Sequence, residues 1–145
     1  MRRIILVLSL LVLSTTLLAA CGQTTPAPLE GKGVRVDGGS YWDITPTQLM
    51  LMLENKDFLL VNVHIPYEGE IRDTDLFVPY NEIEANLSKF PHDKAAKIVL
   101  YCRSGSMSAT AARALVSLGF TNVWNVDGGM IEWEKQGYDL IHKPQ

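Results

Sequence analysis

Short apolar runs alternate with segments of helical periodicity along most of this chain. Apolar runs that lack a helical period are typical of buried strands, and they occupy residues 41–44, 58–63, 76–78, 97–101 and 121–126. Apolar residues at helical spacing predict helices at about 46–53, 83–90, 109–118 and 130–136. This alternation predicts an α/β fold in which a mostly parallel sheet carries helices on both faces.

The first residues have a different pattern. Arg2 and Arg3 precede an apolar run that ends in Leu18-Ala19-Ala20-Cys21, an order typical of an export signal. The last four residues resemble the lipobox of bacterial lipoproteins, which implies cleavage before Cys21 and a diacylglyceryl group on its thiol. Residues 1–20 are therefore predicted to be a lipoprotein signal peptide. The alternative, an uncleaved anchor helix, explains the apolar run but not Leu-Ala-Ala-Cys.

Both alternatives predict an exported protein held at a membrane and facing the extracytoplasmic side, at the cell membrane or in the periplasm. Residues 21–40 are rich in Gly, Pro and Thr, so they are predicted to form a flexible, lipidated tether. Val34 and Val36 alternate with polar residues in this range, as in a short strand. The remaining pattern predicts one domain over residues 41–140, which is large enough for a single core.

Composition narrows the classes of function. The chain has 145 residues, of which 47% are hydrophobic and 20% charged, as in a globular protein. Its formal net charge of −3 disfavours nucleic acid as a partner. Its two cysteines are too few for a disulfide framework or a four-cysteine zinc site, and we expect no metal.

Cys102 lies at the carboxyl end of a predicted strand, where open parallel sheets bind their ligands. It opens a small and polar loop that leads into a helix, Cys102-Arg103-Ser104-Gly105-Ser106-Met107-Ser108. Backbone N–H groups of such a loop and the N-terminus of the helix favour a thiolate. The alternative is a cysteine buried as a small hydrophobic residue, which the polar residues 103–106 disfavour.

This loop resembles the active-site loop of the rhodanese (sulfurtransferase) family, whose common form is Cys-Arg-x-Gly-x-Arg. The later Val126-Asp127-Gly128-Gly129, followed by Trp133 and Gly137, resembles the closing Gly-Gly…Trp…Gly pattern of the family. Residues 58–63 resemble its second strand. The resemblance covers nearly the whole predicted domain and implies a three-layer fold with a central, mostly parallel, five-stranded sheet.

The resemblance also implies a reaction. Cys102 would accept sulfur from a small anionic donor such as thiosulfate, become a persulfide, and pass the sulfur to a thiol, cyanide or a protein acceptor. Backbone N–H groups would stabilise the persulfide, and no cofactor is needed. The residues expected to bind substrate are those of the loop, Arg103, Ser104, Gly105, Ser106, Met107 and Ser108.

Four features of the sequence depart from the family pattern. Met107 replaces the last arginine of the usual loop, which predicts weaker thiosulfate binding. Asn62 stands where the family usually has aspartate, and His64 where it often has arginine. The acidic segment 67–75 would repel anionic donors if it lay near the site.

Three residues outside the loop, Asn62, His64 and Asp127, are candidate accessory residues. Asn62 would bond backbone groups of a loop, and Asp127 would brace a turn. His64 could act as a base, but a histidine in this position is more commonly a structural hydrogen-bonding residue.

Other functions compete with sulfur transfer. A phosphatase or arsenate reductase needs arginine at the end of a Cys-x5-Arg loop, where this chain has Ser108. A thiol redox protein would need a partner thiol, because there is no Cys-x-x-Cys. A rhodanese-like module without turnover, acting in binding or sulfur sensing, is favoured by Met107 and disfavoured by the retained Cys102. The sequence leaves the last two alternatives open.

Overall fold

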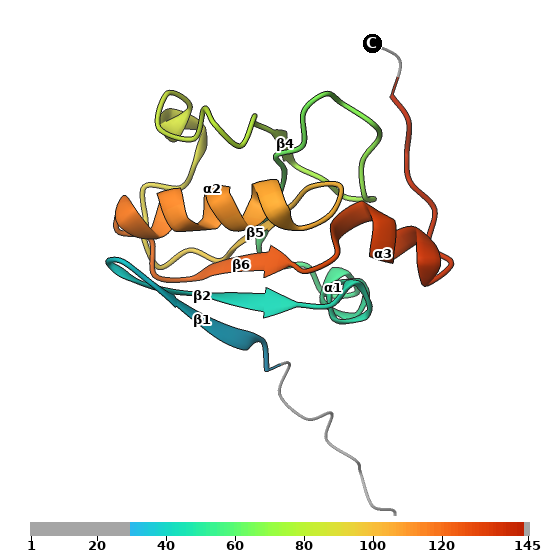
Figure 1. Ribbon diagram of the computed structural model, residues 1–145, viewed down its shortest axis with the longest axis horizontal. Helices are drawn as coiled ribbons and strands as arrows, with labels where there is room; N and C mark the ends of the chain where they lie inside the picture. Colours follow the sequence, from blue (N-terminus) through green and yellow to red (C-terminus); the bar gives the residue numbers. More distant parts are fainter. Residues whose placement is uncertain (1–29, 144–145) are drawn as a thin grey trace, which may run out of the picture.

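A six-stranded sheet between layers of helices forms the body of the computed structural model, which describes residues 30–143 (Figure 1). The strands are β1 Lys32–Val36, β2 Gly39–Ile44, β3 Leu59–Asn62, β4 Leu76–Phe77, β5 Ile98–Tyr101 and β6 Val123–Val126. Their order across the sheet is β1-β2-β6-β5-β3-β4. The neighbours from β2 to β4 pair in parallel, and β1 pairs antiparallel with β2. The predicted parallel α/β sheet of five strands is confirmed, with β1 as a sixth, antiparallel strand.

β1 lies inside the range that composition predicted to be tether. It forms a hairpin with β2, and its half-buried Val34 and Val36 pack against the core. The sheet therefore begins at Lys32, before the predicted domain boundary at residue 41. β1 is an edge strand in which the valines are only half-buried and the other residues are exposed, so few of its positions are apolar and the sequence indicates it only weakly. The predicted signal peptide and Cys21 lie outside the described residues.

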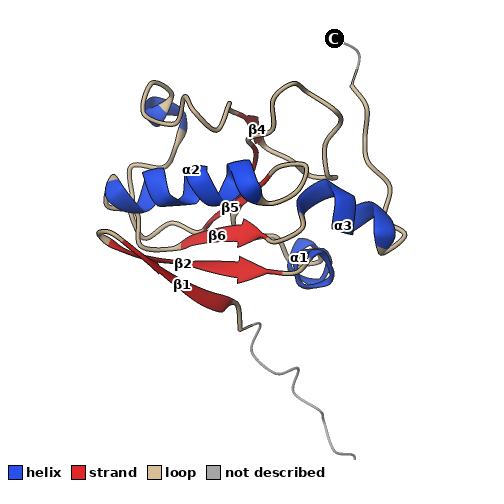
Figure 2. Cartoon of the chain, viewed as in Figure 1, coloured by secondary structure: helices blue, strands red, loops and turns tan. Residues whose placement is uncertain are grey.

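Residues 30–143 contain three α-helices, α1 Pro46–Leu53, α2 Ser106–Ser117 and α3 Gly129–Lys135. Thr45 followed by Pro46 is the order of an N-cap and a first helical residue, and Thr45 caps α1. Its hydroxyl accepts the N–H of Gln48, and the Gln48 side chain accepts the N–H of Thr45. α2 packs on one face of the sheet, and α1 and α3 pack on the other. Figure 2 shows α1 and α3 together near one end of the sheet. In the part of the chain that the structure describes, no helix combines the length and apolar content that crossing a membrane requires.

The prediction of a helix at residues 83–90 is wrong. The chain there forms turns and a short 3₁₀ helix, η1 Leu87–Lys89. Ile83 and Phe90 are buried, so their spacing reflects two separate anchors in the core. Between them, the Asn86 side chain donates to the carbonyl of Glu82, the kind of bond that competes with a regular helix.

β5 is an interior strand, and its burial explains its unbroken apolar sequence. Ile98 and Leu100 face the α2 side of the sheet, and Val99 and Tyr101 face the α1 and α3 side. All four residues are fully buried. Cys102 follows directly and continues the row on the α2 side.

Candidate active site

The carboxyl ends of three neighbouring parallel strands gather the candidate residues. Asn62 at the end of β3 is opposite Tyr101 at the end of β5, and Leu100 is opposite Asn125 of β6. The loops that follow these strands therefore lie at one edge of the sheet. Figure 1 shows the loop after β5 between the beginnings of α2 and α3. Cys102 is the first residue of that loop.

The thiol of Cys102 is buried, with 1% of the residue exposed, and it is not in a disulfide. Its sulfur accepts the backbone N–H of Gly105 at 3.1 Å. The hydroxyl of Ser108 lies 3.4 Å from the same sulfur and 3.1 Å from the carbonyl oxygen of Gly105. A hydroxyl has one proton, so these two bonds are alternatives, and a charged sulfur is the stronger acceptor. Burial suits a structural cysteine, but polar donors directed at the sulfur suit one that carries negative charge.

The beginning of α3 holds the cysteine loop from the other side. The N–H groups of Met130 and Ile131 donate to the carbonyls of Cys102 and Arg103, each at 2.9 Å. Gly129 makes this approach possible, because a Cβ there would lie 2.2 Å from the carbonyl oxygen of Cys102. The Gly-Gly motif seen in the sequence thus packs against the cysteine loop.

Gly105 shapes the loop at the start of α2. Its φ of +91° lies in the left-handed region, which favours glycine. This conformation accompanies the turn that brings its N–H to the sulfur of Cys102. A Cβ at Gly105 would also lie 3.0 Å from the backbone nitrogen of Gly128. The glycine is therefore required both for the backbone angle and for space.

Asn62 fastens the loop that follows β3. Its side chain is fully buried, donates to the carbonyl of Gly69 at 3.0 Å and accepts the N–H of His64 at 3.0 Å. These contacts fit the structural role that the sequence suggested for Asn62. An ionised aspartate could not make both, because it has no proton to donate to Gly69.

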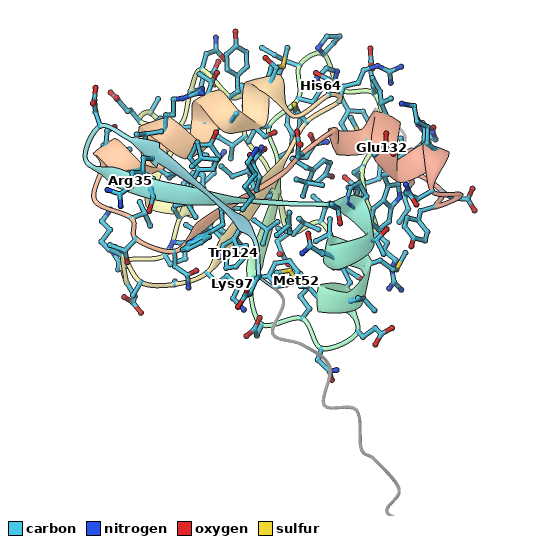
Figure 3. All side chains as sticks on the ribbon, turned by 60° about the horizontal axis from the view of Figure 1, so that its bottom comes forward. Arg35, Met52, His64, Lys97, Trp124 and Glu132 are labelled. Carbon is cyan, nitrogen blue, oxygen red and sulfur yellow. The ribbon has the colours of Figure 1, made fainter. Side chains whose placement is uncertain are left out.

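His64 is buried, but its ring has no hydrogen-bond partner among the described residues. Its Nε2 lies 3.4 Å from Oε2 of Glu68 without the geometry of a hydrogen bond. In the view of Figure 3, His64 is drawn between the ribbons of α2 and α3, at the opposite side of the picture from Lys97, which directly precedes β5. Among residues 30–143, the imidazole thus has no partner of the kind that a structural hydrogen-bonding role would need. Buried polar atoms without partners are uncommon and call for an explanation.

Arg103 forms an ion pair that the sequence analysis missed. Its Nη1 lies 3.1 Å from Oε2 of Glu68, and both side chains are exposed, at 45% and 40%. Glu68 is the acidic residue of segment 67–75 that contacts the cysteine loop. By contrast, Glu70 pairs with Lys143 and Asp75 with Lys56. Glu68 is 35 positions from Arg103 in sequence, and nothing in their local patterns indicates that they meet.

The other predicted site residues take different positions. Met107 is half-buried and packs against the core on the α2 side. Ser104 and Ser106 are exposed. Asp127 is exposed too, and its backbone N–H donates to the carbonyl of Ile44 at 2.9 Å. The structure thus groups Cys102 with Gly105 and Ser108, and Arg103 with Glu68 and His64.

Fold and site together define an α/β domain with a cysteine loop at the carboxyl edge of a parallel sheet. Residues 45–136, more than half of the chain, match the family model described as the rhodanese-like domain. The chain therefore belongs to the rhodanese-like domain family, as the sequence resemblance predicted.

Similar proteins support this assignment. A protein named "Sulfurtransferase" from Allochromatium vinosum is 34% identical over 93 residues, which cover 62% of this chain and 84% of that protein. The probable adenylyltransferase/sulfurtransferase MoeZ of Mycobacterium tuberculosis is 35% identical over 98 residues, which cover 64% of this chain and 24% of that protein. The crystal structure of a rhodanese-like domain protein from Staphylococcus aureus aligns with a TM-score of 0.58 and 30% identity, covering 70% of this chain and 98% of that chain.

Proposed function

We propose that this protein is a sulfurtransferase in which Cys102 carries sulfur as a persulfide. The observation that carries the proposal is the environment of the Cys102 sulfur, which accepts the N–H of Gly105 and lies within reach of the Ser108 hydroxyl. Family membership and relatives named sulfurtransferases support this class of activity.

In the first half-reaction the Cys102 thiolate attacks the sulfane sulfur of the donor. A new S–S bond forms to Sγ, and the old bond to that sulfur breaks. Its electron pair leaves with the rest of the donor, which is sulfite when the donor is thiosulfate. In the second half-reaction an acceptor, either a thiolate or cyanide, attacks the outer sulfur, and the bonding pair returns to Sγ. Both steps balance without an added oxidant or reductant.

The loop would assist both steps by stabilising charge on sulfur. Negative charge is on Sγ before the first step and returns there in the second. The N–H of Gly105 and the O–H of Ser108 are fixed donors beside this atom. The remaining N–H groups of residues 103–107 are predicted to stabilise the outer sulfur of the persulfide.

A turnover assay tests the proposal. The purified protein is given thiosulfate or polysulfide together with cyanide, and thiocyanate is measured. The wild type should form thiocyanate, and Cys102→Ser should lose this activity while its circular dichroism stays unchanged. Wild-type rates in Cys102→Ser would contradict the mechanism. No turnover from any donor in the wild type would favour a binding or sulfur-sensing module.

We further propose that the protein is exported and that lipid on Cys21 anchors it to a membrane. The support is the order of charged, apolar and small residues before Cys21 in the sequence. Replacing Cys21 by serine should release the protein from the membrane fraction, whereas Cys102→Ser should leave it there. Continued membrane association of Cys21→Ser would favour an uncleaved anchor helix.

A further inference from the structure

We propose that Glu68 makes this site select an uncharged hydropersulfide as sulfur donor over a dianion such as thiosulfate. This inference rests on the proposed sulfur transfer at Cys102. It concerns the charge that an arriving donor meets at the cysteine loop.

The loop has little net positive charge to offer an anion. Arg103 is the only cationic side chain in residues 102–108. Its guanidinium already lies 3.1 Å from the carboxylate of Glu68. Met107, on the same loop, is apolar and half-buried. The ion pair therefore presents a donor with a cation whose charge is largely offset.

Hydrogen bonds hold the backbone on both sides of Glu68. The buried Asn62 side chain accepts the N–H of His64, before Glu68, and donates to the carbonyl of Gly69, directly after it. One residue further on, the backbone of Glu70 exchanges two hydrogen bonds of 2.8 Å with Ile141. Glu68 thus differs from a surface charge on a freely moving loop.

The carboxylate of Glu68 is also approached from two directions. Its Oε2 lies 3.1 Å from Nη1 of Arg103 and 3.4 Å from Nε2 of His64. The His64 ring is buried and has no hydrogen-bond partner within residues 30–143. The C-terminal segment that fastens this loop, at Ile141 and Lys143, lies beyond residues 45–136 of the family match. The arrangement is therefore built in part from residues outside the shared domain.

The two donors make different electrostatic demands. With thiosulfate, a thiolate must approach a dianion; the products are an anionic persulfide and sulfite. A hydropersulfide R–S–SH reacts as an electrophile in its protonated form, so when its R group is uncharged the thiolate attacks a neutral molecule. The products are the protonated persulfide Cys102–S–SH and R–S⁻, and charge is again conserved. Unpaired positive charge near the sulfur would therefore speed the first reaction and have little effect on the second.

The test compares the two donors in one assay. Sulfur loading of the full-length protein is followed by intact mass, with thiosulfate or with the hydropersulfide of 2-mercaptoethanol. Glu68→Gln keeps the shape of the side chain and removes its charge. The matched control is Glu54→Gln, because Glu54 is exposed at the end of α1, before the amino end of β3 and away from the loop.

Glu68→Gln should raise the second-order rate of loading from thiosulfate by about fivefold, the size expected for an exposed ion pair. Loading from the hydropersulfide should stay within about twofold, and Glu54→Gln should change neither rate. Glu68→Ala gives a second test if the glutamine pairs with Arg103 through its amide oxygen. An unchanged thiosulfate rate in both Glu68 variants, or an equal change with both donors, would overturn the inference. Failure of the wild type to load sulfur from either donor would instead overturn the proposed function, and this inference with it.

Discussion

The hydroxyl of Ser108 lies 3.4 Å from the sulfur of Cys102, six residues earlier in the chain. Ser108 is fully buried in the first turns of α2, so its position is set by the helix. In the proposed sulfur transfer this sulfur gains and loses negative charge, which a fixed donor beside it would stabilise.

Replacing Ser108 by alanine should therefore slow sulfur transfer. We expect kcat to fall by about tenfold, which corresponds to one lost hydrogen bond to a charged group. The control is Ser117→Ala at the other end of α2, where the hydroxyl donates to the carbonyl of Ala114. Equal rates in wild type and Ser108→Ala would show that this hydroxyl does not support the reaction.

Gly129→Ala should disrupt the contact between α3 and the cysteine loop. The new Cβ would lie 2.2 Å from the carbonyl oxygen of Cys102, at a φ of +53°. We expect a loss of more than about 3 kcal/mol in the free energy of unfolding, measured with urea, and a loss of sulfur transfer.

Gly137→Ala provides the matched control for that substitution. Gly137 also has a positive φ, but a Cβ there meets nothing within 4 Å. Its cost should be limited to the backbone term of about 1–2 kcal/mol. Similar costs at Gly129 and Gly137 would contradict the close approach of α3 to the loop.

Tyr101→Phe should loosen the segment that carries Glu68. The Tyr101 hydroxyl accepts the N–H of Ile71 at 3.0 Å and lies 2.7 Å from the hydroxyl of Thr74. Removing it leaves a buried N–H without a partner, which should cost about 1–3 kcal/mol in urea denaturation at neutral pH. An unchanged free energy of unfolding would show that these bonds do not stabilise the loop.

The same residue predicts a change of stability with pH. Burial is the largest cause that raises the pKa of Tyr101 above its ordinary value of 10.0. A tyrosine whose pKa is raised in the folded protein contributes its full stabilisation at pH values below the ordinary pKa. This stabilisation is lost as the pH rises above the ordinary pKa, because the unfolded chain then ionises while the folded protein does not. Between pH 9 and about pH 11, the wild type should lose more stability than Tyr101→Phe. Parallel losses in the two proteins would contradict the raised pKa.

Met107→Arg should improve the use of thiosulfate by adding an unpaired cation to the loop. We expect kcat/KM for thiosulfate to rise by about tenfold. The melting temperature should fall slightly, because Met107 packs against the core on the α2 side. A lower kcat/KM in a folded variant would show that missing positive charge on the loop does not limit the use of thiosulfate.

Local sequence predicted those parts of the fold whose signal is local. β5 is fully buried and therefore uniformly apolar, and the cap at Thr45 needs only the residues up to Gln48. The prediction at 83–90 was wrong because Ile83 and Phe90 reach the core from turns, at a spacing that a helix would also give. β1 gave a weak signal because it is an edge strand with half-buried valines.

For the site too, the local motifs were predictable from the sequence and the contacts between distant segments were not. Cys102, Gly105 and the later glycines lie in short motifs, so their positions at the strand end followed from the sequence. The pairing of Glu68 with Arg103 depends on the path of a loop fixed by Asn62 and by the C-terminal segment. Such a path is set by tertiary contacts, which no local pattern encodes.

The central claim is that Cys102 carries the transferred sulfur, and mass spectrometry of the purified protein tests it most directly. After treatment with thiosulfate, polysulfide or a hydropersulfide, the peptide that contains Cys102 should be heavier by one sulfur atom. Cyanide should remove this sulfur, and the corresponding peptide of Cys102→Ser should never gain it. A folded wild-type protein whose Cys102 peptide gains no sulfur from any of these donors would contradict the claim.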